Sequence, residues 1–402
     1  MHSVRFIHSS DFHLDRPLGG LTHVPSQLRE EFIEAPYVAA ERAFDIAEKD
    51  KVDFVVLSGD IVDLDKSGPR AIDFLCRQFQ RLEKHSIKVF WIGGQVDDLD
   101  LWPVDIPLPK NVHTFTSART EEIEFRGKKD RRVATIVGKS FKSGDEVRAS
   151  DYSVSRSDAA RIAIAYGEVD ERALQRQSID YWALGGRHQA DDVFRSNSAA
   201  RYCGSPQGGR PSESGTHTCS IVQIEHGRTH VRTVATDSVR WQTERIDLAG
   251  DSDMGELSSA IRTRLGSNIS NDKERLTLVS WLVSCRGELR HDLQQEKVCQ
   301  KILSDLSNSH RDRVVSVKLE CEPRMISASH YDEETLLGDF LRTLREFEND
   351  TDQLVRLTDS LPDSEAKRDL IASFSRSTDE ERREVLRDVA SLGMDLLAGH
   401  NS

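Results

Sequence analysis

Short apolar runs that end in glycine-flanked polar residues recur along the first 240 residues, and they limit the possible fold more than any other feature. The runs Val4–His8, Val52–Ser58 and Val89–Ile92 have the length and composition of buried strands. Between them, Pro36–Lys49 and Pro69–Lys84 carry apolar residues at helical spacing. Further strands are predicted at Val133–Val137, Arg161–Ala165 and Tyr181–Leu184. This alternation predicts an α/β domain whose sheet faces are covered.

A second unit begins near residue 245. Asp253–Leu265 and Asp292–Leu306 have helical spacing, and Leu276–Cys285 and Val314–Cys321 have the composition of strands. Beyond them the chain is charged, with helical spacing over Glu333–Phe347. We therefore expect an N-terminal domain, a small α/β domain and a C-terminal helical segment, at residues 1–244, 245–325 and 326–402.

Polar residues follow five of the predicted strands. Asp11 and His13 follow the first strand as D-x-H, and Asp60 follows the second in a G-D pair. Gln95 and its neighbours follow the third strand, Tyr166 follows the strand at Arg161–Ala165, and Gly186 and His188 follow the last. In α/β sheets, ligands bind beyond the carboxyl ends of strands, so these residues are expected to meet in one crevice.

Metal binding is the chemistry that such a crevice supports, because Asp and His are ligands for manganese, iron and zinc. A single D-x-H is more typical of a capped turn with a surface histidine, and G-D after a strand is a common turn. The order of the clusters and their repeated position at strand ends favour the metal site over these alternatives.

The same motifs resemble the calcineurin-like metallophosphoesterases, and within them the nuclease subunit of the bacterial SbcCD repair complex. The resemblance covers residues 1–240 by motif and 245–402 only by layout. It implies a β-sandwich flanked by helices, with a small α/β cap domain and C-terminal helices. The matching segments are RFIHSSDFHLD (5–15), VDFVVLSGDIVD (52–63), VFWIGGQVDD (89–98), DYWALGGRH (180–188) and YCGSPQGGRPSESG (202–215).

Members of that family use two metal ions, which orient a hydroxide and clamp the phosphodiester. Carried over by motif, the ligands of the first ion are all present in this chain. They are Asp11, His13, Asp60 and His188.

The second site does not match the family pattern. Asp60 is shared, but the other three ligand positions are occupied by Gln95, Tyr166 and Gly186. A phenol with a pKa of about 10 is a poor ligand, and glycine has no side chain. The family's general acid is replaced by Val96, and loss of such a proton donor costs about 10²- to 10⁴-fold in rate. The resemblance therefore implies one divalent ion, expected to be Mn²⁺, rather than two.

Three functions remain open at this point. The first is an SbcD-like subunit that acts on or senses DNA ends, with weakened or lost nuclease activity. The alternative is an active metal-dependent phosphodiesterase or exonuclease with a remodelled site. A small-molecule phosphatase is the third, and the appended domains argue against it.

Charge bears on the partners. The net charge is -13, and a protein that binds DNA on its own usually has a basic face, so a partner or a metal is expected to assist. The resemblance implies that the C-terminal helices dock an SbcC-type ATPase, and that the chain forms a homodimer.

The first ten residues lack the apolar core of a signal peptide, and no run is long enough to span a membrane. A cytoplasmic location is expected.

Overall fold

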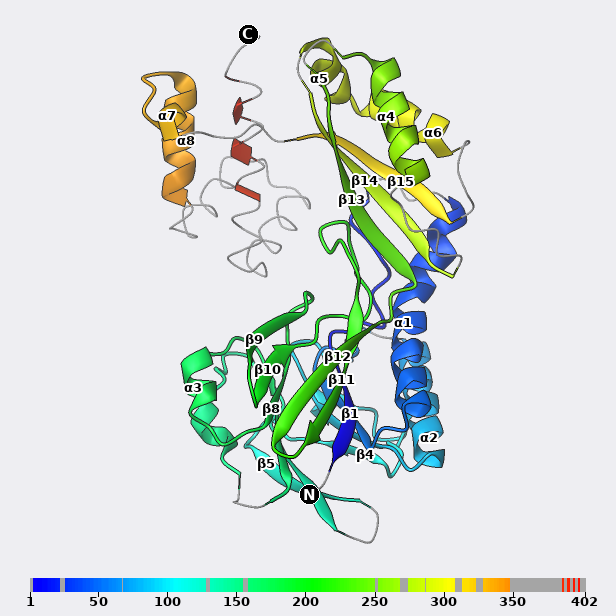
Figure 1. The fold of residues 1–402 in the computed structure, drawn as a ribbon, viewed down its shortest axis with the longest axis vertical. Coiled ribbons are helices and arrows are strands. Elements are labelled where there is room, and N and C mark those ends of the chain that lie inside the picture. Colours follow the sequence, from blue (N-terminus) through cyan, green and yellow to red (C-terminus); the bar gives the residue numbers. More distant parts are fainter. Residues whose placement is uncertain are drawn as a thin grey trace.

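The structure is a computed structural model of the chain (Figure 1). Its described part contains three sheets and the helices that cover them. The described residues are 3–21, 26–66, 68–127, 131–154, 158–249, 252–267, 274–285, 287–307, 313–322, 328–347, 385–386, 389–390, 393–394 and 397.

The first sheet has six strands, and its central part is parallel. β1 pairs with β2, β2 with β3 and β3 with β4, all in parallel, while β11 runs antiparallel to β1. The carboxyl ends of β1, β2 and β3 therefore meet at one edge. In sheet order the strands are β12 (Arg228–Ala235), β11 (Thr218–Glu225), β1 (Val4–Ser9), β2 (Phe54–Ser58), β3 (Lys88–Ile92) and β4 (Val112–Thr114).

The second sheet also has six strands and packs face to face on the first. Phe6, Phe54 and Phe90 of the first sheet share a buried apolar core with Ile162 and Tyr181 of the second. The two sheets thus form a β-sandwich, as expected. In sheet order the strands are β5 (Glu121–Arg126), β6 (Arg132–Gly138), β7 (Ala160–Tyr166), β8 (Tyr181–Gly185), β10 (Ala199–Tyr202) and β9 (Asp191–Arg195).

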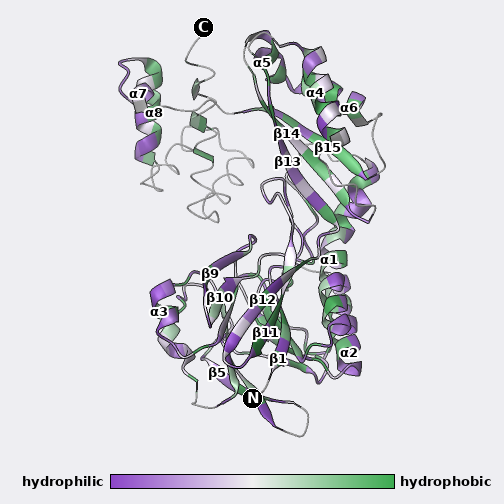
Figure 2. Cartoon of the chain, viewed as in Figure 1, coloured by the Kyte–Doolittle hydropathy of each residue, from purple (hydrophilic) through white to green (hydrophobic). Residues whose placement is uncertain are grey.

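Helices cover the outer faces of the sandwich. α1 (Arg29–Lys49) and α2 (Pro69–Lys84) pack on the first sheet, and the short α3 (Glu171–Gln175) packs on the second. Figure 2 shows both hydrophobic and hydrophilic residues on α1 and α2, as helices that cover one sheet face require. The prediction of a β-sandwich flanked by helices is confirmed.

One helix start was predicted wrongly. The sequence places the start of the first helix at Pro36, but α1 begins at Arg29 and contains Pro36. Proline lacks the N–H that would bond to the carbonyl of Phe32, four residues earlier. The N–H of Leu18 donates to that carbonyl instead, at 3.0 Å. The chain that follows the D-x-H motif is thereby attached to α1.

The third sheet is parallel and has three strands, β13 (Val239–Asp247), β14 (Leu276–Ser284) and β15 (Val314–Cys321). The sequence predicts no strand at 239–247. Only part of β13 is buried, so its sequence lacks the continuous apolar run that marks the other strands. The predicted helix at 292–306 is also corrected, since two helices cover that stretch. The helices on this sheet are α4 (Met254–Ser267), α5 (Gly287–Leu293) and α6 (Glu296–Ser307).

The other face of the third sheet packs on α1. Trp241 of β13 lies edge-on to Phe32, with ring centroids 5.8 Å apart, and both side chains are buried. The small sheet is thus joined to the sandwich through the helix that also anchors the D-x-H segment (Figure 1). The boundary expected at residue 245 stays a prediction, although β13 brings residues from 239 onward into the third sheet.

The C-terminal segment contains α7 (Ala328–Tyr331) and α8 (Leu336–Phe347). Leu337, Leu341 and Leu344 of α8 are buried against Leu386 and Met394. Most of the expected helical segment at 326–402 lies outside the described residues. None of the helices described is both long enough and apolar enough to cross a bilayer.

Candidate metal centre

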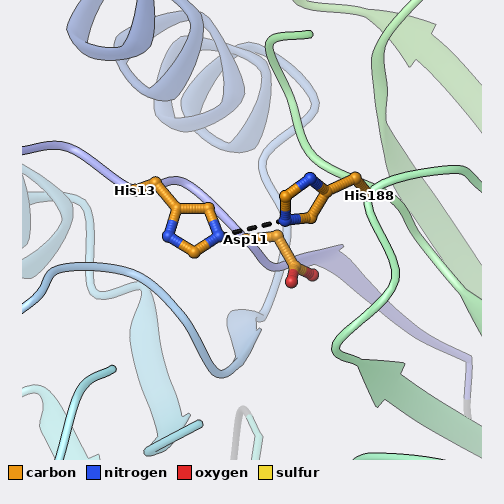
Figure 3. A group of neighbouring side chains, drawn as sticks. All are labelled: Asp11, His13 and His188. Atoms are coloured by element: carbon orange, nitrogen blue, oxygen red, sulfur yellow. Dashed lines mark hydrogen bonds between the residues drawn. The ribbon is translucent and has the colours of Figure 1, made fainter. Parts of the chain in front are cut away.

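Three of the expected ligands meet beyond the carboxyl ends of the strands. The side chains of Asp11, His13 and His188 each offer one ligand atom, and these atoms lie within 4.8 Å of one another. The Nε2 atoms of the two histidines are 3.2 Å apart (Figure 3). Asp11 and His13 follow β1, and His188 follows β8, so each sheet contributes to the group.

The backbone around these residues is tied to the neighbouring strand end. The N–H of Asp11 donates to the carbonyl of Gly59 at 2.9 Å, and that of His13 donates to the carbonyl of Asp60 at 3.1 Å. Asp11, His13 and Asp60 all have positive φ angles, of 54°, 45° and 55°. Such backbone costs about 1–3 kcal/mol per residue and is typical of functional sites.

The donor set fits a divalent cation. Asp11 is 1% exposed, and its Oδ1 has no hydrogen-bond partner among the described residues, although an orphaned buried oxygen is costly. Burial, reinforced by the charge of Asp60, raises the pKa of Asp11 to about 7. Burial also lowers the pKa of His13 to about 4, which leaves its imidazole neutral and able to bind metal. One carboxylate with two imidazoles suits manganese, iron or zinc.

Glu213 orients His188, and the sequence analysis missed it. Its Oε1 lies 2.8 Å from Nδ1 of His188, and its Oε2 accepts the N–H of Gly209 at 2.7 Å. A carboxylate on Nδ1 fixes the tautomer that leaves the Nε2 lone pair for a metal. Burial opposes the charged form of His188, but the bond to Glu213 and the charge of Asp11 outweigh it and raise the pKa. Glu213 lies in the segment 202–215 that resembles the family, but nothing in that segment assigns it a role.

Asp60 lies beside this group rather than within it. Its Oδ2 is 3.9 Å from Nε2 of His13. Both of its oxygens already accept hydrogen bonds: Oδ1 from the N–H of Val96 at 3.0 Å, and Oδ2 from the hydroxyl of Tyr166 at 2.6 Å. Burial, together with the negative charge of Asp60, raises the pKa of Tyr166, so the phenol keeps its proton.

The ring of Tyr166 occupies space that glycines leave free. A Cβ at Gly94 would lie 2.7 Å from Cε2 of Tyr166 and 2.5 Å from Oδ1 of Asp60. A Cβ at Gly186 would lie 3.2 Å from Cζ of the same ring. Gln95, the remaining replaced position, is exposed. A histidine at position 186 and the tyrosine at 166 would therefore compete for the same volume.

The other acidic residues near these positions are used elsewhere. Asp97 is fully buried and accepts from the N–H groups of Asp60 and Ile61 and from the indole of Trp91, at 2.8, 3.1 and 3.0 Å. It therefore supports the loop rather than facing the site. Glu168 pairs with Arg187.

The sequence of this chain is similar to those of known phosphoesterases. Residues 4–190 match the family model of the calcineurin-like phosphoesterases. The chain is 30% identical over 268 residues to the uncharacterized metallophosphoesterase YhaO of Bacillus subtilis, a match that covers 63% of this chain and 65% of YhaO. This chain thus spans just under two thirds of that relative's length.

Two solved structures are also similar. The protein TT1561 of Thermus thermophilus is 10% identical, with a TM-score of 0.36. A dimetal phosphatase from Danio rerio is 11% identical, with a TM-score of 0.33. Each comparison covers 58% of this chain and 99% of the other.

Proposed function

We propose that this chain, which carries a calcineurin-like phosphoesterase domain in residues 4–190, is an SbcD-like subunit that binds one divalent ion and cleaves phosphodiesters at DNA ends only weakly. The family implies a divalent ion, and we propose Mn²⁺. The ligands assigned to it are Asp11, His13 and His188, with Asp60 at the edge of the same site.

One observation carries the proposal: the hydroxyl of Tyr166 donates to Oδ2 of Asp60 at 2.6 Å. A second ion would need Asp60 as its shared ligand. With the N–H of Val96 on Oδ1, each oxygen of Asp60 already accepts a hydrogen bond. The phenolic proton thus supplies the positive partner that a second cation would otherwise provide.

The residues present limit the rate of hydrolysis. A divalent ion bound here supplies a Lewis acid and lowers the pKa of a bound water. Glu213 holds His188 in the tautomer that such an ion requires. Val96, at the position of the family's general acid, cannot donate a side-chain proton to the leaving oxygen, and this loss costs about 10²- to 10⁴-fold. Activity well below that of a two-ion enzyme follows.

The role at DNA ends rests on the motif resemblance and includes partners. With a net charge of -13, the chain repels DNA over most of its surface, so we propose that an SbcC-type ATPase supplies much of the DNA contact. We place its docking on the C-terminal helices and propose a homodimer. A pull-down with such an ATPase tests this part: the full chain is expected to capture it, and a variant without residues 326–402 is not.

Ion counting tests the proposal directly. Calorimetric titration of Mn²⁺ into metal-free chain is expected to give one ion per chain. The double substitution Tyr166→His with Gly186→His removes the phenol and adds two imidazoles beside Asp60, and it is expected to give two. Gly186→His alone, which places a histidine against the tyrosine ring, is the matched control and is expected to stay at one.

Hydrolysis of a DNA end in Mn²⁺ gives the second readout. The wild-type chain is expected to cleave slowly, and the double variant faster. Two ions in the wild-type chain, together with rapid cleavage, would instead establish the remodelled, fully active exonuclease. Cleavage of free nucleotides but not of DNA would revive the small-molecule phosphatase.

A further inference from the structure

A cavity of about 160 Å³ opens onto the ligand cluster. Asp11, His13 and His188 form part of its wall, and none of the replaced second-site positions lines it. Most of the remaining wall comes from residues 16–20 and 205–213, of which the mechanism above uses only Glu213. The cavity therefore reaches the proposed ion from a side that Tyr166 does not border.

Each of these two segments brings one guanidinium group to the cavity. Arg16 is exposed, and the side chain of Arg210 is 47% exposed. Both arginines line the same cavity as the imidazoles of His13 and His188.

The carboxylates of the wall offset only part of this positive charge. Among the described residues that line the cavity, Asp11 and Glu213 are the acidic ones, and both are buried. Asp11 faces the proposed ion. Glu213 is engaged by His188, Gly209 and Arg210. Glu213 thus partly neutralises Arg210, whereas among the described residues no carboxylate of the wall pairs with Arg16.

The two segments are held together, so the arginines sit on a rigid frame. The N–H of Gly19 donates to the carbonyl of Gly209 at 2.8 Å. At Gly20, which has a φ of +80°, a Cβ would lie 2.8 Å from Cδ of Pro211. Only glycine permits this approach. Preorganised cations bind an anion without the entropic cost of ordering their loops.

We infer that this cavity is an anion subsite, in which Arg16 and Arg210 hold a phosphate group of the substrate beside the ion. Guanidinium groups bind phosphate oxygens in a bidentate manner, which suits a group approached from two walls. The inference rests on the proposed function, because it names the part of a phosphodiester substrate that this site takes. The phosphate could belong to a DNA strand or be free phosphate, and the test separates the two.

Equilibrium binding tests the subsite without measuring catalysis. Inorganic phosphate is titrated into full-length chain carrying equimolar Mn²⁺, for the wild type, Arg16→Ala, Arg16→Lys and the control Arg172→Ala. Arg172 is exposed on α3, outside the cavity. We expect Arg16→Ala to weaken phosphate binding about 10- to 100-fold, the usual effect of losing charge-assisted hydrogen bonds, and Arg172→Ala to leave it unchanged. Arg16→Lys is expected to recover part of the loss.

A second arm identifies the source of the phosphate. A dinucleotide with a 5′-phosphate is compared with the same dinucleotide without it, and a substrate subsite predicts tighter binding of the phosphorylated form in wild type but not in Arg16→Ala. Free phosphate is the ligand instead if only inorganic phosphate distinguishes the two proteins. Equal phosphate affinity in wild type and Arg16→Ala would overturn the subsite.

The two proposals fail separately. Ions per chain are counted in the same samples. A count other than one would overturn the one-ion proposal, whereas loss of phosphate binding in Arg16→Ala would still support the subsite.

Discussion

The two sides of the candidate site differ, although strand ends of both sheets build each of them. On one side, here called the ion side, Asp11, His13 and His188 direct their ligand atoms toward one another, and Oδ1 of Asp11 has no donor. On the other side, the tyrosine side, both oxygens of Asp60 accept hydrogen bonds, one of them from Tyr166.

Under the one-ion proposal, this difference is how a second binding position is closed without changing the fold. The sheets, the strand ends and the shared aspartate are all present on the tyrosine side. The two sides differ in volume and hydrogen bonding: the ring of Tyr166 lies where Gly94 and Gly186 carry no side chains, and its hydroxyl donates to the buried carboxylate of Asp60. A cation or a proton offsets the cost of the unpartnered Oδ1 of Asp11, whereas both oxygens of Asp60 already have donors.

The largest expected effect is the loss of a ligand on the ion side. His188→Ala removes one of the two imidazoles, and we expect Mn²⁺ affinity to fall by more than about 100-fold, beyond the effect of losing a supporting residue. Calorimetry measures it. His226→Ala, on an exposed hairpin, is the control and should bind as the wild type does. Unchanged affinity in His188→Ala would remove His188 from the ligand set.

Glu213 should have the next largest effect. Glu213→Ala frees Nδ1 of His188, so the tautomer that offers Nε2 is no longer favoured, and we expect Mn²⁺ affinity to fall about 10- to 100-fold. Glu213→Gln keeps an acceptor for Nδ1 and should lose less. If both variants lost affinity equally, the charge of Glu213 rather than its orienting bond would be the cause.

On the tyrosine side, the expected effect is on stability. Gly94→Ala places a Cβ 2.5 Å from Oδ1 of Asp60, and we expect it to lower the free energy of unfolding by about 1–3 kcal/mol, the usual cost of overpacking. Chemical denaturation measures this change. Gly266→Ala is the matched control, because its Cβ meets nothing within 4 Å. A Gly94→Ala variant as stable as the wild type would show that Tyr166 is loosely held.

Per pH unit, the change in ion affinity should be the smallest of these effects. With its pKa raised to about 7 from 3.8, Asp11 binds a proton more tightly in the ion-free folded chain than in the unfolded chain. The ion-free chain thus loses stability as pH rises from about 4 to 7. Below pH 7, an ion must displace that proton to bind. The apparent affinity for Mn²⁺ should therefore rise about tenfold per pH unit up to pH 7 and level off above it.

Melting temperatures with and without Mn²⁺ at pH 5.5, 6.5 and 7.5 measure this dependence. The raised pKa of His188 acts in the same direction, because its imidazole must also be neutral to bind. Asp11→Asn should remove most of the trend. Ion-induced stabilisation that is independent of pH would contradict it.

Much of the fold followed from local pattern. The strands β1, β2 and β3 and the helix α2 were expected within a few residues, because buried strands and amphipathic helices have distinct periods. The errors lie where contacts between residues far apart in the sequence determine the secondary structure. α1 extends through Pro36 because Leu18 satisfies the freed carbonyl of Phe32, and β13 is a strand because β14 pairs with it.

The candidate site divides in the same way. Its D-x-H, G-D and final histidine were visible as motifs at strand ends, and the structure brings Asp11, His13 and His188 together there. Glu213 was not visible, because its partner His188 is 25 residues away and no spacing rule links them. Tyr166 was seen only as a replaced ligand. Its bond to Asp60, 106 residues distant, emerges only from the packed sheets.

The sequence by itself determined the layered α/β architecture and the chemical types of residue at each strand end, because hydrophobic period and turn chemistry act over a few residues. Only the tertiary structure decided which of those residues face an open cavity and which are already satisfied. That decision depends on whether a ring fits between Gly94 and Gly186, and on which donors reach each carboxylate oxygen. Both are properties of segments far apart in the chain, which meet when the two sheets pack.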